Sequence, residues 1–92
     1  MIIDMAAGRR ELVKLKNIGE TSVEKLLDIG ISSREQIEEL GAVAVYKRLR
    51  ERYPVSMTML WALQGALLDL PYYQIPREIR DALIEELSNE EV

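Results

Sequence analysis

The 92-residue sequence contains neither cysteine nor histidine, and no long apolar run. Without cysteine, disulfides, thiolate nucleophiles and thiolate metal sites are excluded. Without histidine, serine and threonine lack the base that most often activates them. No stretch approaches the roughly 18 apolar residues of a membrane span, and the first residues lack the apolar region of a signal peptide. We therefore expect a cytoplasmic, non-enzymatic protein with no cofactor, no metal and no membrane contact.

Other motifs that carry chemistry are missing as well. The sequence has no Asp-x-Asp calcium loop and no phosphate-binding GxxxxGK run. Its adjacent acids, Glu38-Glu39 and Glu85-Glu86, are neighbours in sequence, and such neighbours do not share a helix face. We interpret them as solvated charge, so the expected activity is binding.

The charge is unevenly distributed along the chain, whose net charge is −4. Residues 1–53 carry ten Lys/Arg against nine Asp/Glu, a balance of +1. Residues 54–92 carry two against seven, a balance of −5. Only the first half is therefore suited to attract a polyanion.

Apolar residues recur at helical spacing through the whole chain, which predicts an all-α fold of five or six helices. Hydrophobic residues make up 48% of the sequence and charged residues 30%, enough for one packed core with a solvated exterior. We expect one domain over residues 1–92, with a leader at 1–11 and a frayed tail at 89–92. The expected helices are 5–16, 22–29, 33–40, 42–53, 56–70 and 76–88.

Glycine punctuates the first half at a spacing of eleven residues, at Gly8, Gly19, Gly30 and Gly41. The last three each follow a short apolar helical segment, where glycine favours the left-handed position after a helix. This pattern predicts compact helical hairpins, with each short helix ended by glycine.

Hydroxyl residues and prolines predict the helix starts and stops. Thr21-x-x-Glu24 and Ser32-x-x-Glu35 have the form of a capping box, and Ser56 is a further expected cap. Pro54 is expected to stop the fourth helix, because proline disfavours helical geometry in the preceding residue. Pro76 is expected at the first position of the last helix.

The segment 56–70 is apolar on nearly every side, which predicts a helix at the centre of the fold. Gly65 and the alanines of this segment are expected to let neighbouring helices approach closely. Trp61, Met57 and Met59 are expected to belong to the core. The last helix is expected to bury Ile79, Leu83 and Leu87.

The segment 15–31 is similar to a helix-hairpin-helix, whose tight turn offers backbone N–H groups to a nucleic-acid phosphate. Asn17 replaces the usual first glycine, and Glu20 and Glu24 put negative charge where phosphate would lie. We therefore favour a structural hairpin over a DNA contact. The candidate nucleic-acid or partner-binding residues here are Lys14, Lys16, Asn17, Gly19 and Lys25.

A second basic group lies in the fourth helix, at Lys47, Arg48, Arg50 and Arg52. It is suited to a phosphate backbone or an acidic partner, but we favour an ordinary solvated helix face. Tyr72 and Tyr73, between two prolines, form either a lid over the core or an exposed apolar anchor for a partner. The sequence leaves both alternatives open.

Several segments together resemble the C-terminal domain of the TfoX/Sxy family, bacterial regulators of competence for DNA uptake. They are Asn17-Ile-Gly-x-x-Ser22, Leu27-x-Ile-Gly-Ile31, Leu40-Gly-Ala-Val and Pro54-Val-Ser56 followed by Ala62-Leu-x-Gly-Ala-Leu67. The resemblance implies a five- or six-helix fold related to the SAM-like or helix-hairpin-helix group. Full-length relatives carry another, N-terminal domain and act with the cyclic-AMP receptor protein. We do not expect that domain here, and fold likeness alone does not establish function.

Three hypotheses follow. The leading one is an interaction domain that contacts a protein partner, such as a transcription regulator. The alternative is weak, non-specific DNA binding through the 15–31 hairpin and the basic group of the fourth helix. The third is a homo-oligomer formed through Tyr72 and Tyr73 or through another apolar patch.

Overall fold

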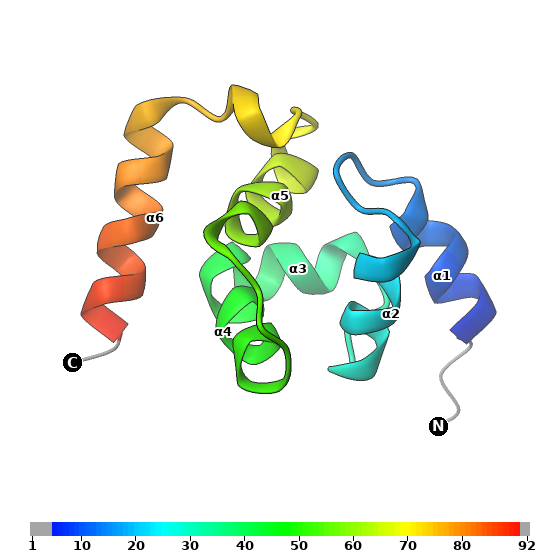
Figure 1. The fold of residues 1–92 in the computed structure, drawn as a ribbon. Helices are drawn as coiled ribbons and strands as arrows, with labels where there is room; N and C mark the ends of the chain where they lie inside the picture. Colours follow the sequence, from blue (N-terminus) through cyan, green and yellow to red (C-terminus); the bar gives the residue numbers. More distant parts are fainter. Residues whose placement is uncertain (1–4, 91–92) are drawn as a thin grey trace.

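A computed structural model describes residues 5–90 of the chain, apart from the side chain of Glu90. Six α-helices, one 3-10 turn and no strand lie within these residues (Figure 1), which confirms the all-α prediction. In order they are α1 (Met5–Val13), α2 (Glu20–Asp28), α3 (Arg34–Leu40), α4 (Ala42–Arg52), α5 (Met57–Leu68), η1 (Tyr72–Gln74) and α6 (Arg77–Glu90). No helix within residues 5–90 has the length and apolar character needed to cross a bilayer.

Helix α5 lies at the centre of the fold, as predicted. It packs against α3 and α4, and η1 lies against its end (Figure 1). Leu60, Leu63 and Ala66 are buried, while Met57, Met59 and Trp61 are only partly buried at the edge of the core. A helix apolar on all sides needs neighbours on several sides, and α5 has them.

Every α-helix contributes to one apolar core. The predicted stripe of α4 is confirmed, because Ala42, Val45, Tyr46 and Leu49 are buried. In α6, Leu83 and Leu87 are buried and Ile79 packs against the core, again as predicted. No polar or charged residue among those described is buried, so apolar burial supplies the core of this part of the chain.

The four evenly spaced glycines have different roles: the prediction that the last three each end a helix is confirmed for Gly30 and Gly41 and is wrong for Gly19. Gly30 has φ +86°, and Gly30 N–H and Ile31 N–H bond back to the last turn of α2. Gly8 lies buried inside α1, Gly19 precedes α2, and Gly41 joins α3 directly to α4.

Both predicted capping boxes are misplaced. Helix α2 begins at Glu20 after Gly19, so Thr21 lies inside its first turn and caps nothing. At α3 the cap is Ser33, whose Oγ accepts a hydrogen bond from Gln36 N–H at 3.2 Å. A hydroxyl residue and a Glu or Gln three positions later also occur here one residue along, so the sequence pattern alone could not choose between Ser32 and Ser33.

The helix ends at prolines agree more closely with expectation. Tyr53 is extended before Pro54, and α4 ends at Arg52. Ser56 precedes α5 as expected, although its side chain makes no capping hydrogen bond. Helix α6 begins at Arg77, one residue after the predicted start at Pro76.

The helices at the two ends of the chain differ in extent from the predicted ones. Residues 5–11 of the expected leader belong to α1, which buries Leu12. Helix α1 ends at Val13, three residues before the predicted end, because the chain turns at residues 14–17. Helix α6 extends to Glu90 into the expected frayed tail; residues 1–4 and 91–92 lie outside the described residues.

Candidate functional site

Asn17 joins the turn between α1 and α2 to the chain that follows α5. Its backbone has φ +72°, a left-handed conformation that asparagine tolerates. Its Nδ2 donates a hydrogen bond to Leu70 O at 2.8 Å, and its Oδ1 accepts one from Tyr72 N–H at 2.9 Å. A second, longer contact joins Nδ2 to Ala62 O at 3.4 Å. One side chain therefore fixes the path from α5 into η1.

This arrangement places the predicted hairpin residues in two groups. The Asn17 side chain faces the protein and is committed to backbone partners. Lys14, Lys16 and Gly19 are exposed at the turn, next to the uncapped start of α2. Glu20 lies in the first turn of α2 and offsets the positive end of its dipole.

The basic residues of α4 lie at the other end of α2. Arg52 makes an ion pair with Asp28, the last residue of α2, at 3.2 Å. Lys14 and Lys16 precede the first residue of α2, so the helix length, about 13 Å, separates the two groups. The candidate residues of the α1–α2 turn and those of α4 therefore lie at opposite ends of α2, and Lys25 lies between them.

The remaining basic candidates differ in exposure. Arg48 and Arg50 are exposed, and Arg50 lies over the ring of Tyr46 at 5.5 Å from its centroid. Lys47 is half-buried. Lys25 lies over the ring of Tyr53 at 5.4 Å, so its charge is held beside the junction of α2 and α4.

A hydrogen bond also ties the end of α4 to α2. Tyr53 Oη donates to Asp28 Oδ2 at 2.5 Å. This hydrogen bond, partial burial and the negative charge of Asp28 together raise the pKa of Tyr53 above its usual value, while Arg52 acts in the opposite direction. The phenol of Tyr53 therefore keeps its proton at neutral pH, and its hydrogen bond to Asp28 joins α4 to α2.

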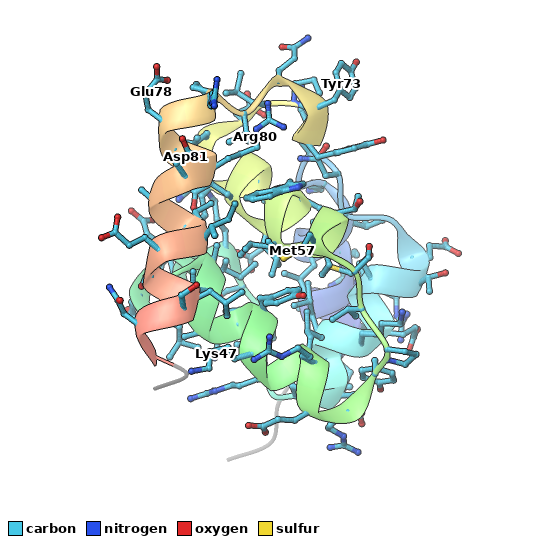
Figure 2. All side chains as sticks on the ribbon, turned by 60° about the vertical axis from the view of Figure 1, so that its left-hand side comes forward. Lys47, Met57, Tyr73, Glu78, Arg80 and Asp81 are labelled. Carbon is cyan, nitrogen blue, oxygen red and sulfur yellow. The ribbon has the colours of Figure 1, made fainter. Side chains whose placement is uncertain are left out.

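Tyr72 and Tyr73, named here the tyrosine pair, form the most exposed aromatic surface described. Their rings meet edge to face, with centroids 5.4 Å apart. Tyr72 is 43% exposed and Tyr73 67%, and Figure 2 shows Tyr73 pointing away from the body of the molecule. Both rings are therefore exposed and do not form a lid over the core.

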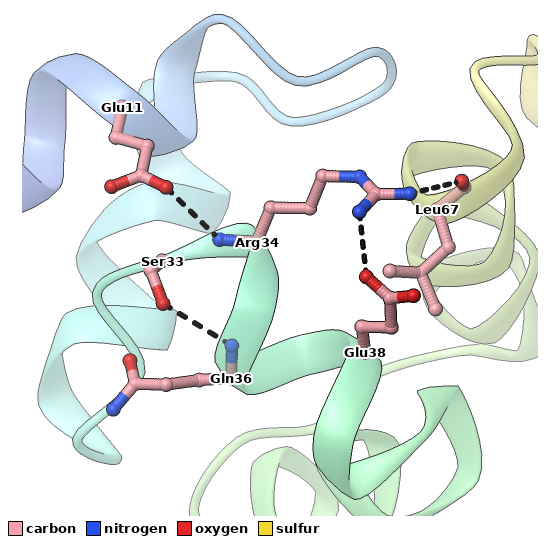
Figure 3. Close-up of polar contacts among 6 residues, drawn as sticks. All are labelled: Glu11, Ser33, Arg34, Gln36, Glu38 and Leu67. Carbon is pink, nitrogen blue, oxygen red and sulfur yellow. Dashed lines mark hydrogen bonds and ion pairs between the residues drawn. The ribbon is translucent and has the colours of Figure 1, made fainter.

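Arg34 positions the end of α5, which leads to the tyrosine pair (Figure 3). Its Nη2 donates to Leu67 O at 2.7 Å, and its Nη1 pairs with Glu38 at 2.7 Å. Its backbone N–H also donates to Glu11 Oε1 at 3.4 Å. The guanidinium thus supplies a donor to a carbonyl at the end of a helix, where positive charge is favourable.

Two surface grooves lie within the described part of the chain. The first, named the Lys25 groove, has a volume of about 340 Å³ and brings together three separated segments. It is lined by Asn17, Ser22, Lys25, Pro54, Val55, Ser56, Thr58, Met59, Ala62 and Tyr72. Tyr72 therefore belongs both to the tyrosine pair and to the wall of this groove.

The second groove, named the Trp61 groove, has a volume of about 290 Å³ and lies between α5 and α6. It is lined by Trp61, Arg77, Arg80, Asp81 and Ile84. Figure 2 looks onto this side of the molecule, with α6 in front and Arg80 and Asp81 labelled on it. The sequence did not predict either groove, because each depends on how segments far apart in the chain pack together. The one sequence feature that pointed to the Trp61 groove was the apolar Ile84 on the flank of α6.

Comparison with known proteins gives a fold and a family. An uncharacterized protein from Listeria monocytogenes, solved in a triclinic crystal form, superimposes with a TM-score of 0.75 over 87% of this chain and 92% of its own, at 23% sequence identity. At that identity the likeness shows the fold alone. No curated protein matches the chain. The model of the TfoX C-terminal domain matches residues 8–87, from within α1 to Leu87 of α6, and the chain therefore belongs to the TfoX C-terminal domain family.

Proposed function

We propose that this chain is a non-catalytic protein-interaction domain of the cytoplasm, with the tyrosine pair as the anchor of its binding surface. The observation that carries the proposal is the exposure of two adjacent tyrosines whose backbone is fixed. Tyrosine combines a large apolar ring with a polar hydroxyl, and it is enriched where proteins meet.

The tyrosine pair is held in place before any partner binds. Asn17 Oδ1 accepts the Tyr72 N–H, Pro71 precedes the turn, and the two rings restrict one another. Ordering flexible side chains costs binding free energy, so a fixed aromatic surface loses less on association. The adjoining Lys25 groove adds hydroxyl groups and a positive charge for polar contacts at the edge of the interface.

We further propose a regulatory setting for this interaction, with a transcription regulator as the class of partner. The match to the TfoX C-terminal domain supports this setting. The overall acidic balance favours a protein over nucleic acid as the main partner, because the net charge of −4 repels phosphate.

A photo-crosslinking amino acid at position 73 tests the proposal in native lysate. The matched control carries the same group at position 48, which is also exposed but lies on α4. We expect a specific cross-linked protein from position 73 that is absent from position 48 and is competed by the unlabelled chain. The Tyr73→Ala chain should compete at least about tenfold less well, the loss of a central aromatic anchor being worth about 2 kcal/mol or more. No specific product from position 73, or full competition by Tyr73→Ala, would reject the proposed surface.

Weak DNA binding is the second candidate function, and the exposure of Lys14, Lys16 and Gly19 at the start of α2 favours it. Non-specific binding of this kind has a Kd of about 10⁻⁴–10⁻⁶ M at physiological salt and weakens steeply with added salt. Fluorescence anisotropy with duplex DNA should then show binding that Lys14→Gln/Lys16→Gln reduces. No binding at low salt near 100 µM protein, an order-of-magnitude ceiling, removes this candidate.

A further inference from the structure

We propose that the Trp61 groove receives an acidic, amphipathic segment of a partner protein. A large apolar side chain of that segment would lie between Trp61 and Ile84, and an adjacent carboxylate would pair with Arg80. This inference goes beyond the proposed function, because the groove shares no residue with the tyrosine pair or with the Lys25 groove.

The Trp61 groove forms because α6 packs against α4 with one side and leaves the neighbouring side of α6 exposed. Leu83 and Leu87 face the core and are buried, whereas Ile84 is 43% exposed. Consecutive residues of a helix differ by about 100° in direction, so Ile84 lies on the flank beside the buried stripe. Trp61 of α5 forms the facing wall and is only partly buried. An apolar floor therefore remains available to a partner.

The size of the groove selects its occupant. At about 290 Å³, it lies at the lower limit of pockets that hold small ligands and cofactors. It is also open at the surface and bounded by two helices. Insertion of one or two side chains from a helical segment fits such a space, in the way that amphipathic helices place their apolar face into grooves.

The arginines that line the groove favour a negatively charged partner segment. Residues 54–92 contain only two basic residues, Arg77 and Arg80, against seven acidic ones, and both arginines line this groove. Arg77 has Asp81 as a distant partner at 3.8 Å. The half-buried Arg80 makes no ion pair with any side chain that the structure describes. A carboxylate from a partner would satisfy it with charge-assisted hydrogen bonds.

The test uses the full chain and Trp61 as an internal reporter, because this is the only tryptophan in the sequence. The probe is a synthetic amphipathic helical peptide with a leucine and with glutamates three and four positions further along. At this spacing the glutamates lie beside the leucine on the same helix face. One control peptide replaces these glutamates with lysine, and the other replaces leucine with alanine. We expect the glutamate peptide to shift Trp61 emission to shorter wavelength in a saturable manner, and both control peptides to bind at least about tenfold more weakly.

Three variants separate binding from folding. Arg80→Gln should weaken binding of the glutamate peptide about tenfold or more, since it removes the charge-assisted hydrogen bonds to the carboxylate. Arg80→Lys keeps the charge and should retain part of the affinity. Arg48→Gln removes an exposed charge outside the groove and should leave binding unchanged. Urea unfolding of each variant shows that the comparison is made between folded proteins.

Several outcomes would overturn the inference. Equal binding of the glutamate and lysine peptides, unchanged binding to Arg80→Gln, or no shift of Trp61 emission near 1 mM peptide would each do so. A concentration-dependent dimer in light scattering, with the same emission shift in the absence of peptide, would assign the groove to a second copy of the chain instead. The Tyr73→Ala chain should bind the peptide normally, so this result is independent of the proposed function.

Discussion

Asn17 and Gly65 lie so close that a Cβ on residue 65 would stand 2.4 Å from Asn17 Nδ2. The same Cβ would lie 2.5 Å from Leu70 O, the carbonyl that Asn17 binds. Gly65 is therefore needed for a close approach, not for an unusual backbone angle. The approach brings the α1–α2 turn, α5 and the start of η1 together at a single point, next to the tyrosine pair.

Replacement of Gly65 by alanine should destabilise the protein. In an ordinary helix interior, glycine to alanine stabilises by about 1 kcal/mol. Here the added methyl group would displace the Asn17 amide and the Leu70 carbonyl, so we expect a net loss of about 1–3 kcal/mol, as for an overpacked core. Urea unfolding followed by Trp61 fluorescence measures the change.

Gln64→Ala provides the control for that substitution, because it adds alanine to the same helix at a half-buried neighbour. Its effect should stay within about 0.5 kcal/mol, as for most substitutions outside a special contact. If Gly65→Ala is as stable as the parent chain or more so, the crowding inferred at this point is contradicted.

Asn17 should be replaceable by glycine more readily than by alanine. Asn17→Gly removes the side-chain hydrogen bonds and should cost about 1–3 kcal/mol. Asn17→Ala removes the same bonds and also strains a residue at φ +72°, which adds about 1–2 kcal/mol. Equal free energies of unfolding of the two variants would show that the left-handed backbone of residue 17 does not contribute to the difference. In the Asn17→Gly background, Gly65→Ala should cost less than in the parent chain.

The sequence predicted the core elements well because their signal is strong and repeated. The apolar stripe of α4 and the all-round apolar α5 each depend on many residues, and no single turn could reverse them. The helix ends depended on single residues. A glycine after an apolar segment has several uses, and Gly41 both ends α3 and begins α4, so even spacing could not reveal the separate roles.

The candidate site was harder to predict, because it depends on contacts between distant segments. Asn17 was a candidate binding residue in a hairpin expected to be structural, and the contacts of its amide with residues 70 and 72 could not be predicted from the sequence. The same residue also shows what could be foreseen: asparagine in place of glycine kept the left-handed turn. Gly65 was expected to admit a neighbouring helix, whereas an asparagine side chain and a carbonyl occupy that space.

Arg34 should stabilise the junction of α3 and α5 in a way that lysine cannot reproduce. Its guanidinium reaches Leu67 O and Glu38 at once (Figure 3). We expect Arg34→Lys and Arg34→Ala each to lower the free energy of unfolding by about 1–2 kcal/mol. The ammonium of lysine cannot direct donors at both partners as the planar guanidinium does, and alanine has no side-chain donor.

Glu38→Gln is the matched control for Arg34. It weakens only the exposed pair between residues four apart, which contributes about 0.3–0.5 kcal/mol. If Arg34→Lys loses no more than this control in urea unfolding, the bond to the α5 carbonyl contributes nothing measurable.

The bond from Tyr53 to Asp28 should be visible in the alkaline titration of the protein. Because the pKa of Tyr53 is raised in the folded state above the ordinary value of 10.0, its contribution to stability is complete below pH 10. That contribution is then lost as the pH rises through the pKa of the folded state. Ultraviolet absorbance of tyrosinate, compared between the parent chain and Tyr53→Phe, isolates this phenol from the other three tyrosines.

Two substitutions should move that titration in opposite directions. Asp28→Asn removes the carboxylate that accepts the phenol hydrogen bond, so the pKa of Tyr53 should fall toward its ordinary value. Arg52→Gln removes the positive charge that favours tyrosinate, so the pKa of Tyr53 should rise further. Opposite shifts cannot come from a general loosening of the fold, which would move both variants toward the ordinary value. A shift of both variants in the same direction would therefore contradict the geometry at the junction of α2 and α4.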